Sequence, residues 1–169
     1  LCEALLLSRP DEAAIPIELS RLYRVHGDPQ SGIDVLNAFR ATHPDDQDTL
    51  VALGKMLASE HDLKAAEPLL EAAVALRPDD AELWHELADI RSEQDRIAEA
   101  GPMYERAYEL QPTIENKARL AASLIARCQY PEALRVIDEL LIECPLLTEE
   151  FIGYKVYALT SLGRHDEAL

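Results

Sequence analysis

The string His85-Glu86-Leu87-Ala88-Asp89 comes nearest to a metal-binding pattern in this sequence. In the H-E-x-x-H motif, two histidines four residues apart share a helix face and bind zinc. Asp89 stands where the second histidine belongs, and a catalytic zinc needs three protein ligands rather than the two that His85 and Asp89 offer. We therefore predict that the pair lines a binding surface and holds no metal.

The cysteines do not suggest redox chemistry. Cys2, Cys128 and Cys144 are odd in number and contain no C-x-x-C pair, which is typical of reduced thiols used as small apolar side chains. Cys128 is expected to end one helix and Cys144 the next, antiparallel one, so that about 18 Å separates them, beyond the reach of a disulfide. Reduced thiols favour a cytoplasmic location, and the periplasm or another compartment remains open.

Other functional signatures are missing. The sequence has no G-x-x-x-x-G-K-[ST], G-x-G-x-x-G or G-x-S-x-G string, so we predict neither an enzyme nor a cofactor. The net charge of −16 disfavours nucleic acid, because phosphate binding needs a basic face. No apolar run approaches the roughly 20 residues of a membrane-spanning helix, which predicts no membrane insertion.

A 34-residue repeat organises the elements that position these side chains. Prolines recur every 34 residues and then after 33, at Pro10, Pro44, Pro78, Pro112 and Pro145. Twelve residues before the later four stand small residues, Gly32, Ala66, Ala100 and Ala133. The first residue is Leu1 rather than Met, so we expect the chain to be a piece of a longer protein.

Each repeat predicts two antiparallel helices, because apolar residues recur at spacings of three, four and seven. In one repeat these helices would cover about 47–60 and 64–76, with the turn at His61 and Asp62. The recurring proline ends the second helix, and the aspartates after it favour the start of the next. Pro68 and Pro102 are expected in or near the first turn of a second helix, where backbone N–H groups are unpaired.

This pattern resembles the tetratricopeptide repeat family over nearly the whole chain. The positions that carry the resemblance in one repeat are Trp84, Leu87, Ala88, Ala100, Tyr104, Ala107 and Pro112. Departures include Gly32 in place of alanine, Pro16 in place of tryptophan, and one residue missing between Pro112 and Leu120. The resemblance implies an all-α fold, a right-handed superhelical α-solenoid of antiparallel helix pairs. The predicted parts of this continuous array are a second-helix tail at 1–12, repeats at 13–46, 47–80, 81–114 and 115–147, and a partial repeat at 148–169.

Both ends of the array are expected to lack cover within the chain, since stacked repeats bury their apolar faces on neighbours. The residues concerned are Leu1, Leu5 and Leu6 at one end and Phe151, Tyr154 and Tyr157 at the other. This pattern predicts a longer native array or self-association through the uncapped ends.

In the resembled family, first helices line a concave groove that binds a peptide. Transferred to this chain, that groove implies a peptide-binding set of Ile17, Arg21, Arg24, Val51, Lys55, His85, Glu86, Asp89, Arg119 and Ala122. The lysine–asparagine clamp of chaperone-tail binders is not matched at these positions. With only Asn37 and Asn116, an asparagine ladder is not matched either.

The charge of the third repeat suggests the partner. Residues 81–114 carry eight acidic and three basic side chains, which favours a partner segment with basic residues. We therefore predict a non-catalytic scaffold that binds a protein or peptide in its groove. The alternative is a regulatory or substrate-recruiting region of a larger enzyme whose catalytic domain lies outside this chain.

Overall fold

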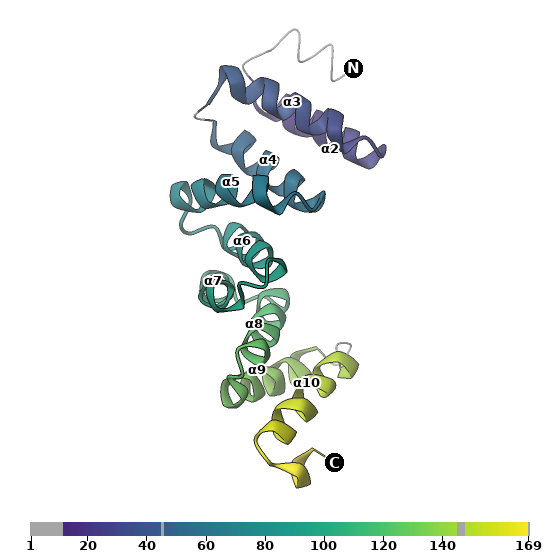
Figure 1. Cartoon of the computed structure of the whole chain (residues 1–169), viewed down its shortest axis with the longest axis vertical. Coiled ribbons are helices and arrows are strands. Elements are labelled where there is room, and N and C mark those ends of the chain that lie inside the picture. Colours follow the sequence, from purple (N-terminus) through teal and green to yellow (C-terminus); the bar gives the residue numbers. More distant parts are fainter. Residues whose placement is uncertain (1–11, 45, 145–147, 169) are drawn as a thin grey trace. The chain divides into compact units, whose positions relative to one another are not determined.

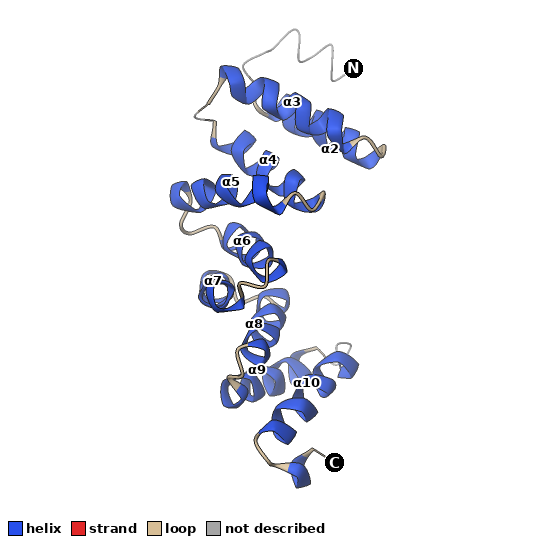
Figure 2. Ribbon diagram, viewed as in Figure 1, coloured by secondary structure: helices blue, strands red, loops and turns tan. Residues whose placement is uncertain are grey.

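The computed structural model describes residues 12–44, 46–144 and 148–168, except for the side chains of residues 148 and 150. Within these ranges all regular elements are helical (Figure 2). They are α2 (Ala14–Val25), α3 (Pro29–Thr42), α4 (Gln47–Ser59), α5 (Leu63–Leu76), α6 (Ala81–Glu93), α7 (Ile97–Leu110), α8 (Ile114–Ala126), α9 (Tyr130–Glu143), α10 (Thr148–Ser161) and the short 3₁₀ helix η2 (His165–Glu167). The predictions made for Leu1, Cys2, Leu5, Leu6, Pro10 and Pro145 lie outside the described residues.

The chain divides into two compact units, residues 1–78 and 79–169. In the first unit α2 pairs with α3 and α4 with α5, while α3 also packs against α4. In the second unit α6 pairs with α7, α8 with α9, and α9 with α10, and α7 packs against α8 (Figure 1). We call α2, α4, α6, α8 and α10 the first helices, and α3, α5, α7 and α9 the second helices.

Side-chain caps start the first helices at regular positions. Asp46 accepts the backbone N–H of Thr49 at 2.7 Å, Asp80 does the same for Leu83 at 3.4 Å, and the hydroxyl of Thr113 accepts that of Asn116 at 3.2 Å. Each cap satisfies an N–H that the first helical turn leaves unpaired. The spacing from Asp80 to Thr113 is one residue shorter than the spacing from Asp46 to Asp80, because a residue is missing after Pro112.

The turn inside each pair also recurs. One residue in each of these turns adopts the left-handed conformation, at Gly27, His61, Asp95 and Cys128, and Gly163 does so after α10. That conformation reverses the chain between two helices, but it strains any residue with a Cβ atom. The turn is therefore kept even where the sequence offers no glycine.

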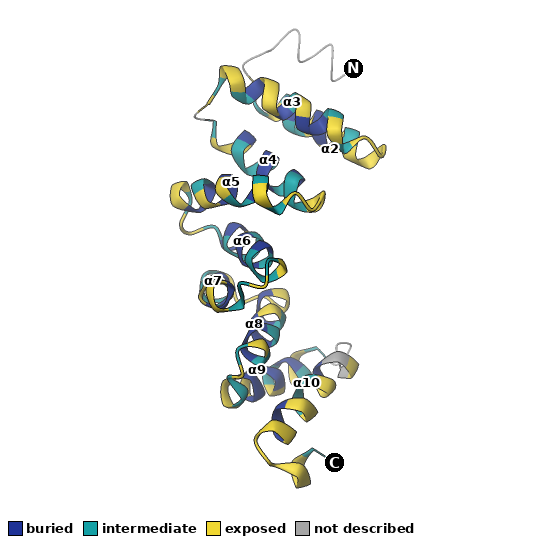
Figure 3. Cartoon of the chain, in the orientation of Figure 1, coloured by how far each residue is buried: buried dark blue, intermediate teal, exposed yellow. Residues whose placement is uncertain are grey.

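The apolar core lies between the helices of each unit (Figure 3). In the first unit the buried cluster is Ile33, Leu36, Leu53, Met56 and Leu69. In the second unit the largest cluster is Leu120, Ala121, Leu124, Ala133, Val136, Ile137, Leu140 and Phe151. The small residues of the repeat permit close helix approach: a Cβ atom on Gly32 would lie 2.9 Å from the backbone oxygen of Ser20, which explains why glycine replaces alanine there.

The expected placement of two prolines was wrong. Pro68 lies inside α5 and Pro102 inside α7, each five residues after the first residue of its helix and thus in the second turn. There a proline removes a backbone hydrogen bond that the helix would otherwise make. Both side chains are exposed, so packing on the buried face holds these helices together.

The expectation of an uncovered carboxy-terminal end was wrong for Phe151. That ring is 3% exposed and belongs to the core cluster of the second unit, and Tyr154 packs against the same cluster half-buried. Tyr157 alone of the three predicted aromatic residues is exposed, at 55%. Helix α10 covers this end because it packs on both α8 and α9.

Two further observations bear on location. Cys128 and Cys144 carry free thiols. Across the part of the chain that the structure describes, no helix combines the length and the hydropathy needed to cross a membrane.

Candidate functional site

The predicted groove residues of the first unit lie on α2 and α4 with different degrees of exposure. Ile17 is half-buried and packs against the apolar cluster of that unit, so it contributes to the core as well. Arg21 and Arg24 are exposed, and Arg21 pairs with Glu18 at 2.5 Å. Val51 and Lys55 are half-buried on α4.

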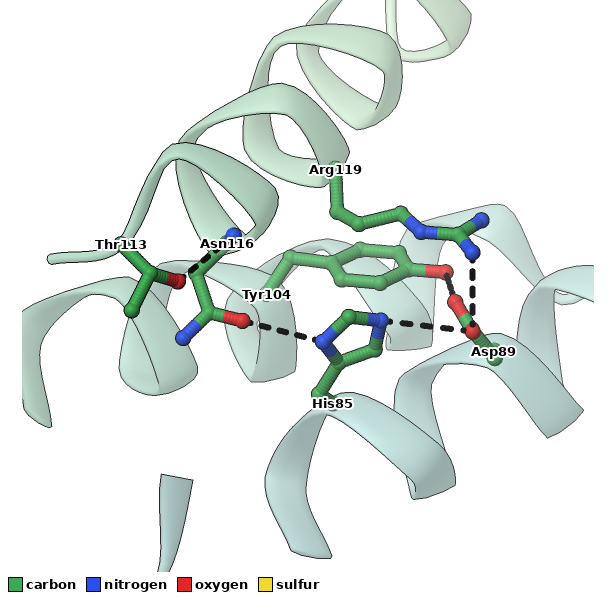
Figure 4. Close-up of polar contacts among 6 residues, drawn as sticks. All are labelled: His85, Asp89, Tyr104, Thr113, Asn116 and Arg119. Atoms are coloured by element: carbon green, nitrogen blue, oxygen red, sulfur yellow. Dashed lines mark hydrogen bonds and ion pairs between the residues drawn. The ribbon is translucent and has the colours of Figure 1, made fainter. Parts of the chain in front are cut away.

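The second unit brings three of the predicted residues into one polar network (Figure 4). His85 and Asp89 lie one turn apart on α6, with 3.4 Å between Nε2 and Oδ2. The guanidinium of Arg119, on α8, lies 3.6 Å from the same Asp89 oxygen. His85 and Asp89 are 13% and 27% exposed, whereas Arg119 is 51% exposed, so its guanidinium faces solvent.

Asn116 joins this network from the first turn of α8. Its Oδ1 lies 2.9 Å from Nδ1 of His85. Its Nδ2 donates to the backbone oxygens of Gln111 at 2.8 Å and Ala107 at 3.3 Å. Ala107 lies in the last turn of α7 and Gln111 follows that helix, and each oxygen also accepts a backbone N–H, from Gln111 at 3.0 Å for Ala107 and from Thr113 at 2.8 Å for Gln111. The buried amide of Asn116 therefore links the end of α7 to α6.

Tyr104 completes the network from α7. Its hydroxyl donates to Oδ1 of Asp89 at 2.5 Å, and its ring meets the His85 ring edge-on, with 6.1 Å between centroids. Burial and the hydrogen bond to Asp89 raise the pKa of the Tyr104 phenol well above its usual range. The phenol therefore stays protonated and acts as a donor.

The network also shifts the pKa values of its two acid–base partners. Burial opposes ionisation of Asp89, but hydrogen bonds from His85 and Tyr104 and the charge of Arg119 outweigh it and lower the pKa of this carboxyl. The hydrogen bond to Asp89 raises the pKa of the His85 imidazole, against the effect of burial. Asp89 is thus an internal anion neutralised by its neighbours.

Glu86 and Ala122, also predicted for the groove, lie half-buried on α6 and α8. Across the described part of the chain, no group of three or more histidine, cysteine, aspartate and glutamate residues is placed to hold a metal ion. What the arrangement offers is a preformed polar surface with an exposed guanidinium at its edge.

The roles of Asn116 and Tyr104 are not among those predicted from the sequence. Tyr104 was read only as part of the repeat pattern, and Asn116 only as one of two asparagines. A signal for Asn116 was present. Thr113 caps the backbone N–H of Asn116, as Asp80 caps the backbone N–H of the buried Leu83 one repeat earlier. The side chain of Asn116 therefore stands at a position that holds a buried leucine in the preceding repeat. A polar residue in a core position must find hydrogen-bond partners.

A hollow of about 490 Å³ lies elsewhere in the second unit, beside the turn between α8 and α9. Its lining consists of Ile97, Ala98, Ala126, Arg127 and Gln129. None of the predicted groove residues contributes to it.

Comparisons with known proteins bear on the repeats first. Sequence profiles described as the tetratricopeptide repeat match residues 47–90 and residues 81–114. Residues 47–114 of the chain are tetratricopeptide repeats. A search of curated proteins finds no match.

Solved structures share the fold of this tetratricopeptide repeat protein. YrrB, described as a TPR protein with an unusual peptide-binding site, is 14% identical, with a TM-score of 0.88 over 99% of this chain and 87% of its own. MamA is 20% identical, with a TM-score of 0.82 over 92% of this chain and 85% of its own. At such identities the likeness establishes the all-α helical repeat fold and not a shared ligand.

Proposed function

We propose that this tetratricopeptide repeat protein is a non-catalytic scaffold that binds a peptide or protein segment on the exposed faces of its first helices. The observation that carries the proposal is the preformed network on α6 and α8, in which the side chain of Arg119 is 51% exposed and pairs with Asp89. A surface whose polar groups are already fixed loses little conformational entropy when a partner binds. The peptide-binding site named for YrrB adds support from a protein of the same fold.

We further propose that the partner segment carries basic residues. The acidic excess of residues 81–114 supports this choice. Asp89 is held within the network, and Glu86 in the middle of α6 is the other acidic residue of the predicted groove. Glu86 is therefore the residue to test.

The test is affinity capture from source lysate at low and at high salt, with the captured proteins identified by mass spectrometry. The chain is compared with Glu86→Lys and with Glu109→Lys, which makes the same charge change at an exposed position on the second helix α7. A partner lost at high salt and lost with Glu86→Lys, but kept with Glu109→Lys, is the expected result. Equal effects of the two substitutions would contradict the first-helix face, and retention at high salt would contradict the basic partner.

We also propose that the chain self-associates, through the exposed apolar side chains of α10 rather than through both ends of the array. Ile152, Val156 and Tyr157 are 46%, 39% and 55% exposed on this helix. Sedimentation equilibrium should show a concentration-dependent dimer that Val156→Asp weakens by tenfold or more, since a charge in an apolar contact costs over about 1.4 kcal/mol. A strict monomer at all concentrations would refute this contact.

The free thiols of Cys128 and Cys144 support a cytoplasmic location, which we also propose. Cell fractionation tests it, and recovery in an oxidising compartment would refute it.

A further inference from the structure

The imidazole of His85 is held between two oxygen atoms that come from different helices. Nδ1 lies 2.9 Å from Oδ1 of Asn116 on α8, and Nε2 lies 3.4 Å from Oδ2 of Asp89 on α6. The side chain is 13% exposed, so water has little access to either nitrogen. Figure 4 shows the ring between the amide and the carboxylate.

The orientation of the Asn116 amide is fixed independently of His85. Its nitrogen already donates to the backbone oxygens of Gln111 and Ala107, and turning the amide over would place an oxygen against both. The atom that faces Nδ1 is therefore an acceptor, and Nδ1 must carry a proton to bond with it. The ionised carboxylate of Asp89 is also an acceptor, so Nε2 must carry a proton as well. Only the doubly protonated imidazolium meets both demands.

Charged and titratable groups face the ring from α6, α7 and α8. Asp89 lies on the same helix, Tyr104 approaches from α7 as a neutral donor to Asp89, and Arg119 approaches from α8. The positive charge of Arg119 opposes protonation of His85, but the Arg119 guanidinium lies beside Asp89. The hydrogen bond between His85 and Asp89 has the larger effect and raises the pKa of the imidazole. The direction of the shift agrees with the hydrogen-bond geometry.

We propose that the proton on His85 acts as a lock between the first helices α6 and α8. With the proton, the ring bonds to Asn116 and Asp89 together, so it ties the Asp89 side of α6 to the already fixed amide of Asn116 on α8. Without it, one nitrogen presents a lone pair to an oxygen, so the ring must withdraw from one partner and the junction of these helices loosens. The lock is independent of the proposed function, because it needs no bound partner.

The first experiment follows the imidazole ¹⁵N signals of the full chain by NMR across a pH titration, folded and in urea. His85 is expected to hold protons on both nitrogens to a higher pH in the folded chain than in the unfolded one. The four other histidines provide reference signals. Asp89→Asn should move the titration of His85 to lower pH, because it removes the anion but keeps the shape of the side chain.

The second experiment measures hydrogen exchange of the first turn of α8, corrected for the intrinsic pH dependence of exchange, at about pH 5.5 and about pH 8. Protection should be several-fold higher at the lower pH in the wild-type chain, and this difference should vanish in His85→Gln. Helix α3, in the other unit, is the internal control. A His85 that titrates no higher folded than unfolded overturns the proposal, and so does a raised titration with unchanged protection of α8.

Discussion

Asn116 shows how one side chain can join three helices. Its amide nitrogen satisfies two carbonyls at the end of α7, its amide oxygen faces His85 on α6, and its own N–H is capped by Thr113 at the start of α8. Removing the side chain would break these contacts at a cost of about 0.5–1.5 kcal/mol for each hydrogen bond, while both backbone oxygens would keep a backbone N–H donor. Fixed in this way, the residue determines where the imidazole of His85 finds its second acceptor.

At the residue scale, we expect the stability of the chain to depend on pH through His85. Because folding raises the pKa of this imidazole, its contribution is fully present below its ordinary value of 6.5 and is lost as the pH rises through the folded value. His85→Gln should lower the free energy of unfolding by about 1–2 kcal/mol at low pH, and the loss should shrink at high pH. Urea unfolding at several pH values measures this, with His165→Gln as the control. A loss that grows with pH would contradict the predicted sign.

At the element scale, close approach and turn geometry explain where the helices meet and where they reverse. Gly101 on α7 lies under the side chain of Arg127, whose guanidinium bonds to Glu105 at 2.6 Å. Asp95 adopts a φ of 61° in the turn between α6 and α7, at the place that Gly27 occupies with a φ of 79° in the first unit. Both features can be tested with matched substitutions.

Gly101→Ala should stabilise the chain less than Gly153→Ala does, because displacing the flexible end of the Arg127 side chain offsets part of the roughly 0.5–1 kcal/mol that alanine gains over glycine inside a helix. Its Cβ atom would lie 2.4 Å from a nitrogen of Arg127 and would push that side chain away from Glu105. Gly153→Ala on α10 is the control, since nothing lies within 4 Å of the new atom, and alanine is favoured over glycine inside a helix by about 0.5–1 kcal/mol. Thermal unfolding distinguishes the two variants, and equal shifts would show that the contact with Arg127 is unimportant.

Asp95→Gly should stabilise the chain by about 1 kcal/mol, because glycine adopts the left-handed conformation without steric cost. Gly27→Ala should do the reverse at the matching turn, where a Cβ atom has open space and only the backbone is strained. Urea unfolding measures both changes. A stabilising Gly27→Ala would contradict this account of the turn.

At the scale of the whole molecule, each of the two units contains an apolar cluster that lies wholly within it. The cluster around Leu36 and Leu53 lies within residues 1–78, and the one around Leu120 and Ile137 within residues 79–169. In repeat arrays stability comes from such local contacts between neighbouring helices. Each unit therefore has a core of its own.

We expect a fragment of residues 79–169 to keep its helices when it is produced alone. A fragment of residues 96–169 is the control, because it separates α7 from α6 and breaks the buried contact of Ala88 with Ala100 and Tyr104. Circular dichroism and amide NMR spectra should show a folded first fragment and loss of structure in α7 of the second. An unfolded first fragment would refute the independence of the unit.

The sequence alone determined the elements of this protein. The 34-residue spacing of prolines and small residues, the aspartates that cap helices, and the three- and four-residue spacing of leucines predicted the all-α repeat fold and the helix pairs. These signals are local, since helix starts, turns and amphipathic faces depend on residues a few positions apart. The same locality let the sequence place His85 and Asp89 on one face of α6.

Only the tertiary structure decided what those side chains do. The pairing of Asp89 with Tyr104 and Arg119, the contact of His85 with Asn116 and the burial of Phe151 all depend on how neighbouring helices pack. Those contacts change with ångström shifts between helices, and no residue spacing in the sequence encodes such shifts. For that reason Asp89, which in the sequence looked like part of an acidic surface, is an internal anion held by its neighbours.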